Sequence, residues 1–220
     1  MNQFENALDN GDAQTVKRLL RENPASLEEP DKYGRRPLMQ AIAGMDRTLG
    51  CVRALLDAGA DVNAATREGY TALHHAVDFM GKLDATTEPG QFIRLLVAAG
   101  ADVEAQQHWD WTPLMRAVLE GSVEETQALL DVGANPNVIF PKDTLPAFMR
   151  GHTLLMKAIS DRIKLPLLLE AGADANMKDE YGQTALEYAQ GLLTKATDEE
   201  YKAEVRDCIR ILEAAPEVIG

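Results

Sequence analysis

The feature that most constrains this chain is the stretch GADVNAATREGYTALHHAV at residues 59–77, because both of its halves recur. Its first half returns as GADVE at Gly100, GANPN at Gly133 and GADAN at Gly172. Its second half, TALHHA, has four further copies: RPLMQA at Arg36, TPLMRA at Thr112, TLLMKA at Thr153 and TALEYA at Thr184. A chain of such copies folds as a row of similar units, each of which contacts its neighbours.

Each copy predicts the same local structure: a turn, a helix, a second helix and a glycine. In one copy the turn DKYGR at residues 31–35 leads into Pro37, and proline is tolerated at the first position of a helix. Apolar residues then follow at helical spacing in both helices. Gly59 ends the second helix in the left-handed conformation that glycine adopts without strain.

These copies resemble the ankyrin repeat, whose signature is a period of about 33 residues with T-P-L-H-x-A in the first helix. Equivalent leucines lie 35, 41, 41 and 31 residues apart, at Leu38, Leu73, Leu114, Leu155 and Leu186. The resemblance covers the chain from Phe4 to Ala215. It implies an all-α fold, an ankyrin-repeat solenoid in which each repeat is a β-turn or hairpin followed by an antiparallel helix pair.

We expect residues 1–220 to form a single ankyrin-repeat domain of six units. Charged outer positions predict that the terminal units cap the stack and shield it from water. The predicted units are an N-terminal capping unit (3–30), repeat 2 (31–64), repeat 3 (65–105), repeat 4 (106–138), repeat 5 (139–177) and a C-terminal capping unit (178–215). Capped ends argue against indefinite stacking, so we expect a monomer before complex formation.

Two insertions interrupt the repeat pattern. Repeat 3 carries an inserted loop, 81–91, between its helices, because glycine and proline there disfavour regular structure. Repeat 5 begins with an extended hairpin, 139–151, which contains Ile139, Phe140, Leu145, Phe148 and Met149. Two interpretations stay open: these side chains pack back on the stack as local core, or they form an apolar finger that enters a cleft of a partner.

The net charge of the chain favours some classes of partner over others. The chain has 22 Lys plus Arg against 35 Asp plus Glu, a net charge of −13. Such a field repels nucleic acid and anionic membranes and attracts a protein with a basic surface. Two cysteines, Cys51 and Cys208, fit a reducing compartment. With no signal-peptide pattern and no apolar run of membrane-spanning length, we expect a cytoplasmic protein.

The sequence offers no pattern for catalysis, for a cofactor or for a metal. Its four histidines are spread over three repeats without an H-E-x-x-H motif, and the cysteines lack the C-x-x-C spacing. A nucleophile elbow, a P-loop and a dinucleotide fingerprint are also missing. We therefore expect no enzymatic activity, no cofactor and no metal.

In the ankyrin family, the resemblance implies a concave binding surface made of the hairpin tips and the exposed face of each first helix. Both tryptophans lie in the middle tip, and tryptophan, tyrosine and arginine dominate interface hot spots. Trp109 is expected to contact the partner, whereas a structural role stays open for Trp111. The predicted partner-binding residues are Tyr33, Arg35, Tyr70, Phe79, Trp109, Trp111, Arg116, Phe140, Phe148, Arg150, His152, Lys157 and Tyr181.

The resemblance to small bacterial cytosolic ankyrin proteins favours a protein–protein interaction module that is a stoichiometric inhibitor of the immunity type. It would occlude a basic enzyme or toxin through its groove and hairpin tips. The alternative is an adaptor or scaffold that recruits a protein or peptide partner without inhibiting it. A third interpretation, a substrate for modification, rests on asparagines that resemble the hydroxylation site of eukaryotic ankyrin proteins: Asn63, Asn137 and Asn176.

Overall fold

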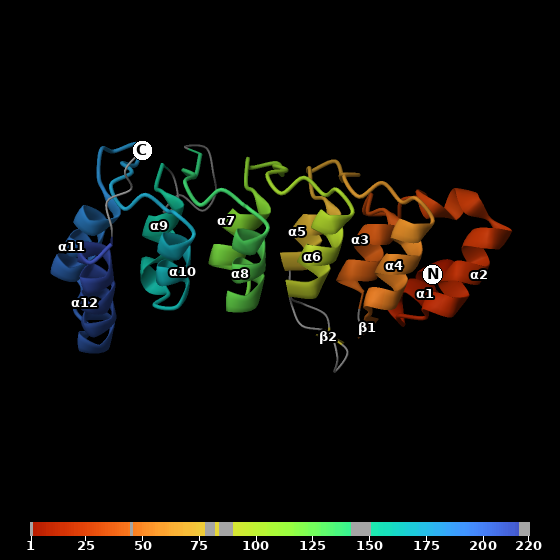
Figure 1. Ribbon diagram of the computed structural model, residues 1–220, viewed down its shortest axis with the longest axis horizontal. Helices are drawn as coiled ribbons and strands as arrows, with labels where there is room; N and C mark the ends of the chain where they lie inside the picture. Colours follow the sequence, from red (N-terminus) through yellow and green to blue (C-terminus); the bar gives the residue numbers. More distant parts are fainter. Residues whose placement is uncertain (1, 45, 78–81, 84–89, 142–150, 216–220) are drawn as a thin grey trace.

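The computed structural model describes the chain except residues 1, 45, 78–81, 84–89, 142–150 and 216–220. Pairs of helices stack side by side along the long axis of the molecule (Figure 1). In chain order the pairs are α1 (Gln3–Asp9) with α2 (Ala13–Glu22), α3 (Pro37–Ala43) with α4 (Leu49–Asp57), α5 (Ala72–Val77) with α6 (Gly90–Ala98), α7 (Pro113–Leu119) with α8 (Val123–Asp131), α9 (Leu154–Lys157) with α10 (Lys164–Glu170), and α11 (Ala185–Lys195) with α12 (Glu199–Glu213).

Two short 3-10 helices, η1 (Pro24–Leu27) and η3 (Ala158–Ser160), complete the helical structure of the described residues. First helices pack on first helices along the row, as α3 does on α5 and α5 on α7. The predicted all-α ankyrin-repeat solenoid is therefore confirmed. Each described helix in this row is too short or too polar to cross a membrane.

The periodic leucines form the centre of the stack. Leu38, Leu73, Leu114 and Leu155 are buried, and Leu186 packs partly buried against the same core. An alanine three residues after each leucine is also buried: Ala41, Ala76, Ala117, Ala158 and Ala189. Each buried leucine contributes roughly 1.5–3 kcal/mol of transfer free energy, and the small alanines let neighbouring helices approach closely.

The turn positions adopt the left-handed backbone that aligns the hairpins. Their φ angles are 77° at Gly34, 80° at Gly69, 55° at Asp110, 71° at Gly151 and 78° at Gly182. Gly59, which ends α4, has a φ of 90°, as predicted. Only the turn at residue 110 lacks glycine, and a non-glycine residue in this region costs roughly 1–2 kcal/mol.

The inserted loop of repeat 3 contains more regular structure than expected. Strand β2 (Lys82–Leu83) pairs in parallel with β1 (Asp46–Arg47) at the edge opposite the hairpins (Figure 1). Helix α6 begins at Gly90, so the prediction that the loop extends to residue 91 is wrong. Gly90 is buried against α8, where a β-carbon would lie 2.7 Å from that of Ala128, so this glycine permits close packing.

The base of the extended hairpin is antiparallel. The N–H of Phe140 donates to the carbonyl of His152 at 2.9 Å, and the N–H of Gly151 donates to the carbonyl of Phe140 at 2.8 Å. The N–H of Leu154 donates to the carbonyl of Val138 at 2.9 Å. Residues 142–150, with the predicted binding residues Phe148 and Arg150, lie outside the described part of the chain.

Candidate interaction surface

Exposed rings gather at one position of the repeat. In the described part of the chain, the exposed large apolar side chains are Tyr33 (64%), Trp109 (37%), Tyr181 (61%) and Ile163 (59%). The first three each stand directly before a left-handed turn residue, so they occupy equivalent hairpin tips. Figure 1 shows these hairpins along one edge of the stack. The surface therefore presents an exposed ring at the same tip position of units 2, 4 and 6, whereas the tip of repeat 3 carries Glu68 at this position.

Aspartates hold the outer tips closed. The carboxylate of Asp31 accepts hydrogen bonds from the N–H groups of Tyr33 (2.8 Å) and Arg35 (2.9 Å), and Arg35 Nε also donates to it at 2.8 Å. Burial alone would raise the pKa of Asp31, but these donors lower it. Asp179 accepts from the N–H groups of Tyr181 and Gln183 in the same way, both at 2.9 Å. These bonds fix the backbone that carries each ring.

The middle tip divides its aromatic residues between core and surface. Trp111 is 4% exposed and Phe140 is 0% exposed, and their ring centroids lie 5.5 Å apart. The prediction that Phe140 contacts a partner is therefore wrong, because its ring fills the space between repeats 4 and 5. Trp111 takes the structural role that the sequence left open. The turn at Asp110 reverses the chain between Trp109 and Trp111, which leaves Trp109 at the surface.

A second cluster lies where repeat 5 meets the last unit. His152 Nδ1 is 3.0 Å from a carboxylate oxygen of Asp179, and the His152 ring centroid is 4.7 Å from that of Tyr188. Lys157 Nζ lies 5.5 Å from the centroid of the same Tyr188 ring. Burial lowers the pKa of Lys157 to about 8 although Asp179 opposes the shift. Burial and the charge of Lys157 lower the pKa of His152, against the effect of Asp179.

A third cluster joins repeats 2 to 4. The guanidinium carbon of Arg116 lies 5.4 Å from the Tyr70 ring centroid, within cation–π range, and Tyr70 is 5.9 Å from the ring of His75. A hollow of about 260 Å³ brings together four predicted binding residues, namely Tyr33, Arg35, Tyr70 and Arg116. Phe79, predicted for the same face, lies outside the described residues.

Two of the three asparagines singled out in the sequence link neighbouring repeats. Asn63 Nδ2 donates to the carbonyl of Gly100 at 3.0 Å, and its Oδ1 accepts from the N–H of Asp102 at 2.8 Å. Asn137 makes the same two bonds between repeats 4 and 5. Its Nδ2 donates to the carbonyl of Gly172 at 3.0 Å, and its Oδ1 accepts from the N–H of Asp174 at 2.7 Å. Both side chains therefore fix the register between repeats.

The two cysteines, which could in principle act as nucleophiles or metal ligands, lie buried in the stack. Cys51 and Cys208 are buried free thiols whose pKa values are raised by burial, so both are poor nucleophiles. Cys208 Sγ donates to the carbonyl of Ile159 at 3.0 Å. Among the described residues, no group of three or more His, Cys, Asp or Glu side chains could hold a metal ion.

The sequence model of a protein family described as ankyrin repeats (3 copies) matches residues 4–88 and 85–179 of this chain. The chain belongs to the ankyrin repeat family. A curated relative, the B-cell lymphoma 3 protein homolog of Mus musculus, is 32% identical over 79% of this chain and 36% of that protein. The E3 ubiquitin-protein ligase KEG of Arabidopsis thaliana is 34% identical over 48% of this chain and 6% of that protein. This ankyrin domain thus spans only a minor part of either relative.

Solved structures match over nearly the whole chain. An ankyrin repeat domain from Acinetobacter baumannii AYE is 25% identical, with a TM-score of 0.70 and 96% of both chains covered. A complex of a predatory endopeptidase from Bdellovibrio bacteriovorus with an immunity protein gives 24% identity and a TM-score of 0.65, covering 98% of this chain and 99% of that chain. Because ankyrin repeats are protein-binding scaffolds, this domain is a protein–protein interaction module.

Proposed function

We propose that this domain binds its partner through the hairpin tips and acts as a stoichiometric, immunity-type inhibitor of an enzyme or toxin with a basic surface. The observation that carries the binding assignment is the row of exposed rings at one repeat position, Tyr33, Trp109 and Tyr181. Aromatic side chains of this kind bury a large area with little loss of conformational entropy. A partner that covers the tips would remove all three rings from water.

The inhibitory role is supported by charge and by shape. A net charge of −13 accelerates encounter with a basic enzyme, and the rings slow dissociation once the complex has formed. An edge of hairpins can cover an active-site cleft without taking part in the reaction. The likeness to the endopeptidase and immunity-protein complex concerns the fold alone, and it supports the proposal because a fold of this size occurs in such an assembly.

The proposal includes a cytoplasmic location and a monomeric state before the complex forms. Both cysteines are free thiols, as expected of a reducing compartment. The alternative is an adaptor that recruits a protein through the same tips without affecting its activity. Two observations on the purified partner separate the alternatives: its own activity and the dependence of that activity on added ankyrin domain.

The test begins with capture of the partner by the immobilised domain from a lysate of the source organism, followed by identification and purification. Activity of the partner is then titrated with the domain. Loss of activity that is complete near a one-to-one ratio supports inhibition. Unchanged activity at saturation rejects inhibition and favours the adaptor.

A matched pair of variants tests the binding surface itself. The triple variant Tyr33→Ala, Trp109→Ala, Tyr181→Ala removes the row of rings, whereas Ile163→Ala removes an equally exposed apolar side chain at the start of α10, away from the hairpins. We expect the triple variant to lose capture and Ile163→Ala to retain it. Equal capture by both variants would show that the partner binds elsewhere.

A further inference from the structure

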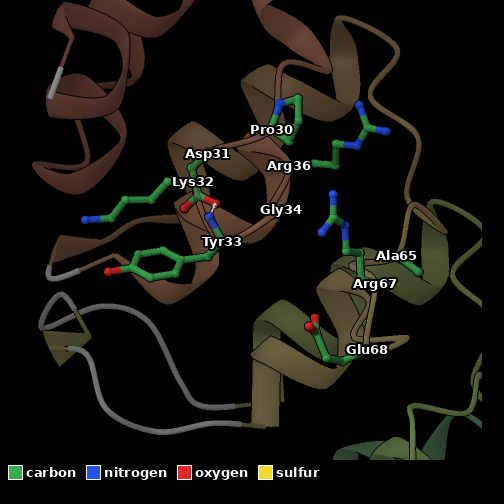
Figure 2. A pocket seen from close by; sticks show the side chains of 9 residues that line it. All are labelled: Pro30, Asp31, Lys32, Tyr33, Gly34, Arg36, Ala65, Arg67 and Glu68. Atoms are coloured by element: carbon green, nitrogen blue, oxygen red, sulfur yellow. Dashed lines mark hydrogen bonds between the residues drawn. The ribbon is translucent and has the colours of Figure 1, made fainter.

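The hollow between the first two full hairpins has a charge opposite to that of the whole chain. It has a volume of about 710 Å³ and is lined by residues 30–34 and 36 of one hairpin and by residues 65, 67 and 68 of the next. Figure 2 shows the Arg36 and Arg67 side chains reaching the space between the two hairpins, with the Glu68 carboxylate below. Lys32 is the third cation of the lining.

The acids of this hollow do not cancel its cations. Asp31 is occupied by Arg35, with an ion pair of 2.8 Å and two backbone N–H bonds. Glu68 is the remaining acid, against Lys32, Arg36 and Arg67. The local balance is therefore positive in a chain whose net charge is −13.

Arg67 is the cation best placed to bind a ligand. Its side chain is exposed, and within the described residues its guanidinium makes no hydrogen bond or ion pair. Arg36, by contrast, donates to the backbone carbonyl of Glu28. A free guanidinium presents a planar pair of N–H donors that matches a carboxylate in two parallel bonds.

Tyr33 connects this hollow to its neighbours. Its ring also lines the adjoining hollows of about 410 and 260 Å³. Two cations flank the ring, with Lys32 Nζ at 4.8 Å and the guanidinium carbon of Arg35 at 5.4 Å from its centroid. An extended segment that crosses the two hairpins would meet cations on one side and an exposed ring at the junction.

We propose that this hollow binds a carboxylate-bearing extended segment of the protein partner, with Arg67 as the principal carboxylate ligand and Tyr33 as the apolar contact. The inference rests on the proposed function and adds the chemistry of one subsite. Long-range attraction selects a partner that is basic overall, while this hollow requires an acidic segment at one place on it. The combination fixes the direction in which the partner docks.

A protein segment fits this hollow better than a nucleic acid does. The positive balance is confined to one hollow, and the net charge of −13 repels a long polyanion once it extends beyond that hollow. A short segment with a few carboxylates avoids this repulsion. At about 0.15 M salt the screening length is about 8 Å, so the contacts within the hollow decide binding.

The test uses a fluorescein-labelled decapeptide of alternating Glu and Ala, its counterpart with Gln in place of Glu, and a single-stranded DNA oligonucleotide of the same length. Fluorescence anisotropy at about 0.15 M salt gives the dissociation constants. Arg67→Glu is compared with Arg53→Glu, which makes the same charge change at an exposed position of α4. Unfolding midpoints of both variants check that they fold.

We expect the Glu peptide to bind at least about 10-fold more tightly than the Gln peptide, and Arg67→Glu to weaken it about 10-fold or more. Arg53→Glu should change the affinity much less. Amide chemical-shift changes on adding the Glu peptide should centre on residues 31–36 and 65–70. Equal affinity for the two peptides, or equal losses in the two variants, would overturn the inference, as would tighter binding of the DNA oligonucleotide that depends on Arg67.

The acidic-segment inference and the proposed function can be rejected separately. If the Glu peptide does not bind but the triple ring variant still abolishes capture of the partner, the acidic-segment inference is wrong and the proposed binding surface stands. If the Glu peptide binds at Arg67 while the captured protein keeps its activity, the subsite stands and the inhibitory role is rejected.

Discussion

The indole of Trp111 meets the ring of Phe140 edge to face, with 5.5 Å between the centroids and 82° between the ring planes. Trp111 belongs to the tip of repeat 4, and Phe140 belongs to the hairpin that opens repeat 5. The contact therefore joins two repeats through their hairpins as well as through their helices. Such interfaces decide whether a solenoid unfolds as one unit.

Trp111→Ala is expected to lower the free energy of unfolding by about 3–5 kcal/mol, because it leaves a cavity between two repeats. Phe140→Ala should cost a similar amount. The double variant should lose less than the sum of the two by about 0.5–1.5 kcal/mol, the coupling of an edge-to-face pair. Urea denaturation of all four proteins measures this coupling, and strictly additive losses would show that the rings do not interact.

The repeat pattern predicted the stack because every repeat has the same needs for buried residues in its helices and for a left-handed residue in its turn. Leu73 and Ala76 recur since each repeat must bury the same face, and Gly34 and Gly69 recur since the turns need a positive φ. Asp110 could be aligned with these glycines only from its spacing. The register of every described tip followed from these positions.

The sequence could not show which neighbour each bulky side chain meets. Phe140 is buried because Trp111 of another repeat covers it, and His152 reaches Asp179 across 27 residues of sequence. Gly90 signals a loop by composition, yet helix packing against Ala128 explains it. Asp179 escaped the sequence analysis, although its place at the start of a turn, equivalent to that of Asp31, was a signal that could have identified it.

Trp109→Ala should weaken partner binding by about 2 kcal/mol, roughly 30-fold in Kd, because the ring is exposed at the centre of the row of tips. Its effect on the free energy of unfolding should be small beside that of Trp111→Ala, which serves as the comparison. Calorimetric titration of the captured partner gives the affinity. Parental affinity in Trp109→Ala would remove the middle tip from the binding surface.

Lys164→Met should destabilise the fold by about 1–3 kcal/mol, because the carbonyls of Val118 and Gly121 lose the donor that Lys164 provides. The carbonyl of Ala117 keeps the N–H of Gly121 and the hydroxyl of Thr126 as donors. Lys164 is 5% exposed, and its Nζ donates to the carbonyls of Ala117, Val118 and Gly121 at 3.1, 3.1 and 2.7 Å. It thus satisfies the C-terminal end of α7 from another repeat.

The matched control for Lys164 is Lys17→Met, which removes a lysine from an exposed position of α2. Thermal and urea unfolding should show a loss for Lys164→Met and little change for Lys17→Met. Equal unfolding midpoints for the two variants would mean that water replaces the ammonium group without cost.

Gly69→Ala and Gly34→Ala should differ although both glycines have a φ near 80°. A β-carbon at Gly69 would lie 2.9 Å from Cα of Gln107, which is backbone of the next hairpin, whereas Gly34 has no atom within 4 Å of that position. Both variants place an alanine in the left-handed backbone conformation, which lowers the free energy of unfolding by roughly 1–2 kcal/mol. Only Gly69→Ala adds an overpacking cost of about 1–3 kcal/mol, measurable by urea unfolding, and equal losses would contradict the contact between hairpins.

Replacing Lys157 should change how stability depends on pH. Its pKa of about 8 lies below the ordinary value of 10.5, so between these values the unfolded chain holds a proton that the folded chain has lost. The free energy of unfolding therefore gains a contribution that rises with pH from 8 to 10.5. Lys157→Met and Lys157→Arg both remove this titration, and both should lack the rise, whatever their stability at pH 7.

The measurement for Lys157 is the difference in unfolding free energy between parent and variant, taken by urea denaturation at intervals from pH 7 to 10.5. Asp179, His152 and Tyr188 face the same amine, and burial raises the pKa of Tyr188, which affects the alkaline end in the opposite direction. Subtracting the variant from the parent isolates Lys157, because Tyr188 is present in both. A difference that stays level across this range would show that the Lys157 amine remains charged and hydrated in the folded domain.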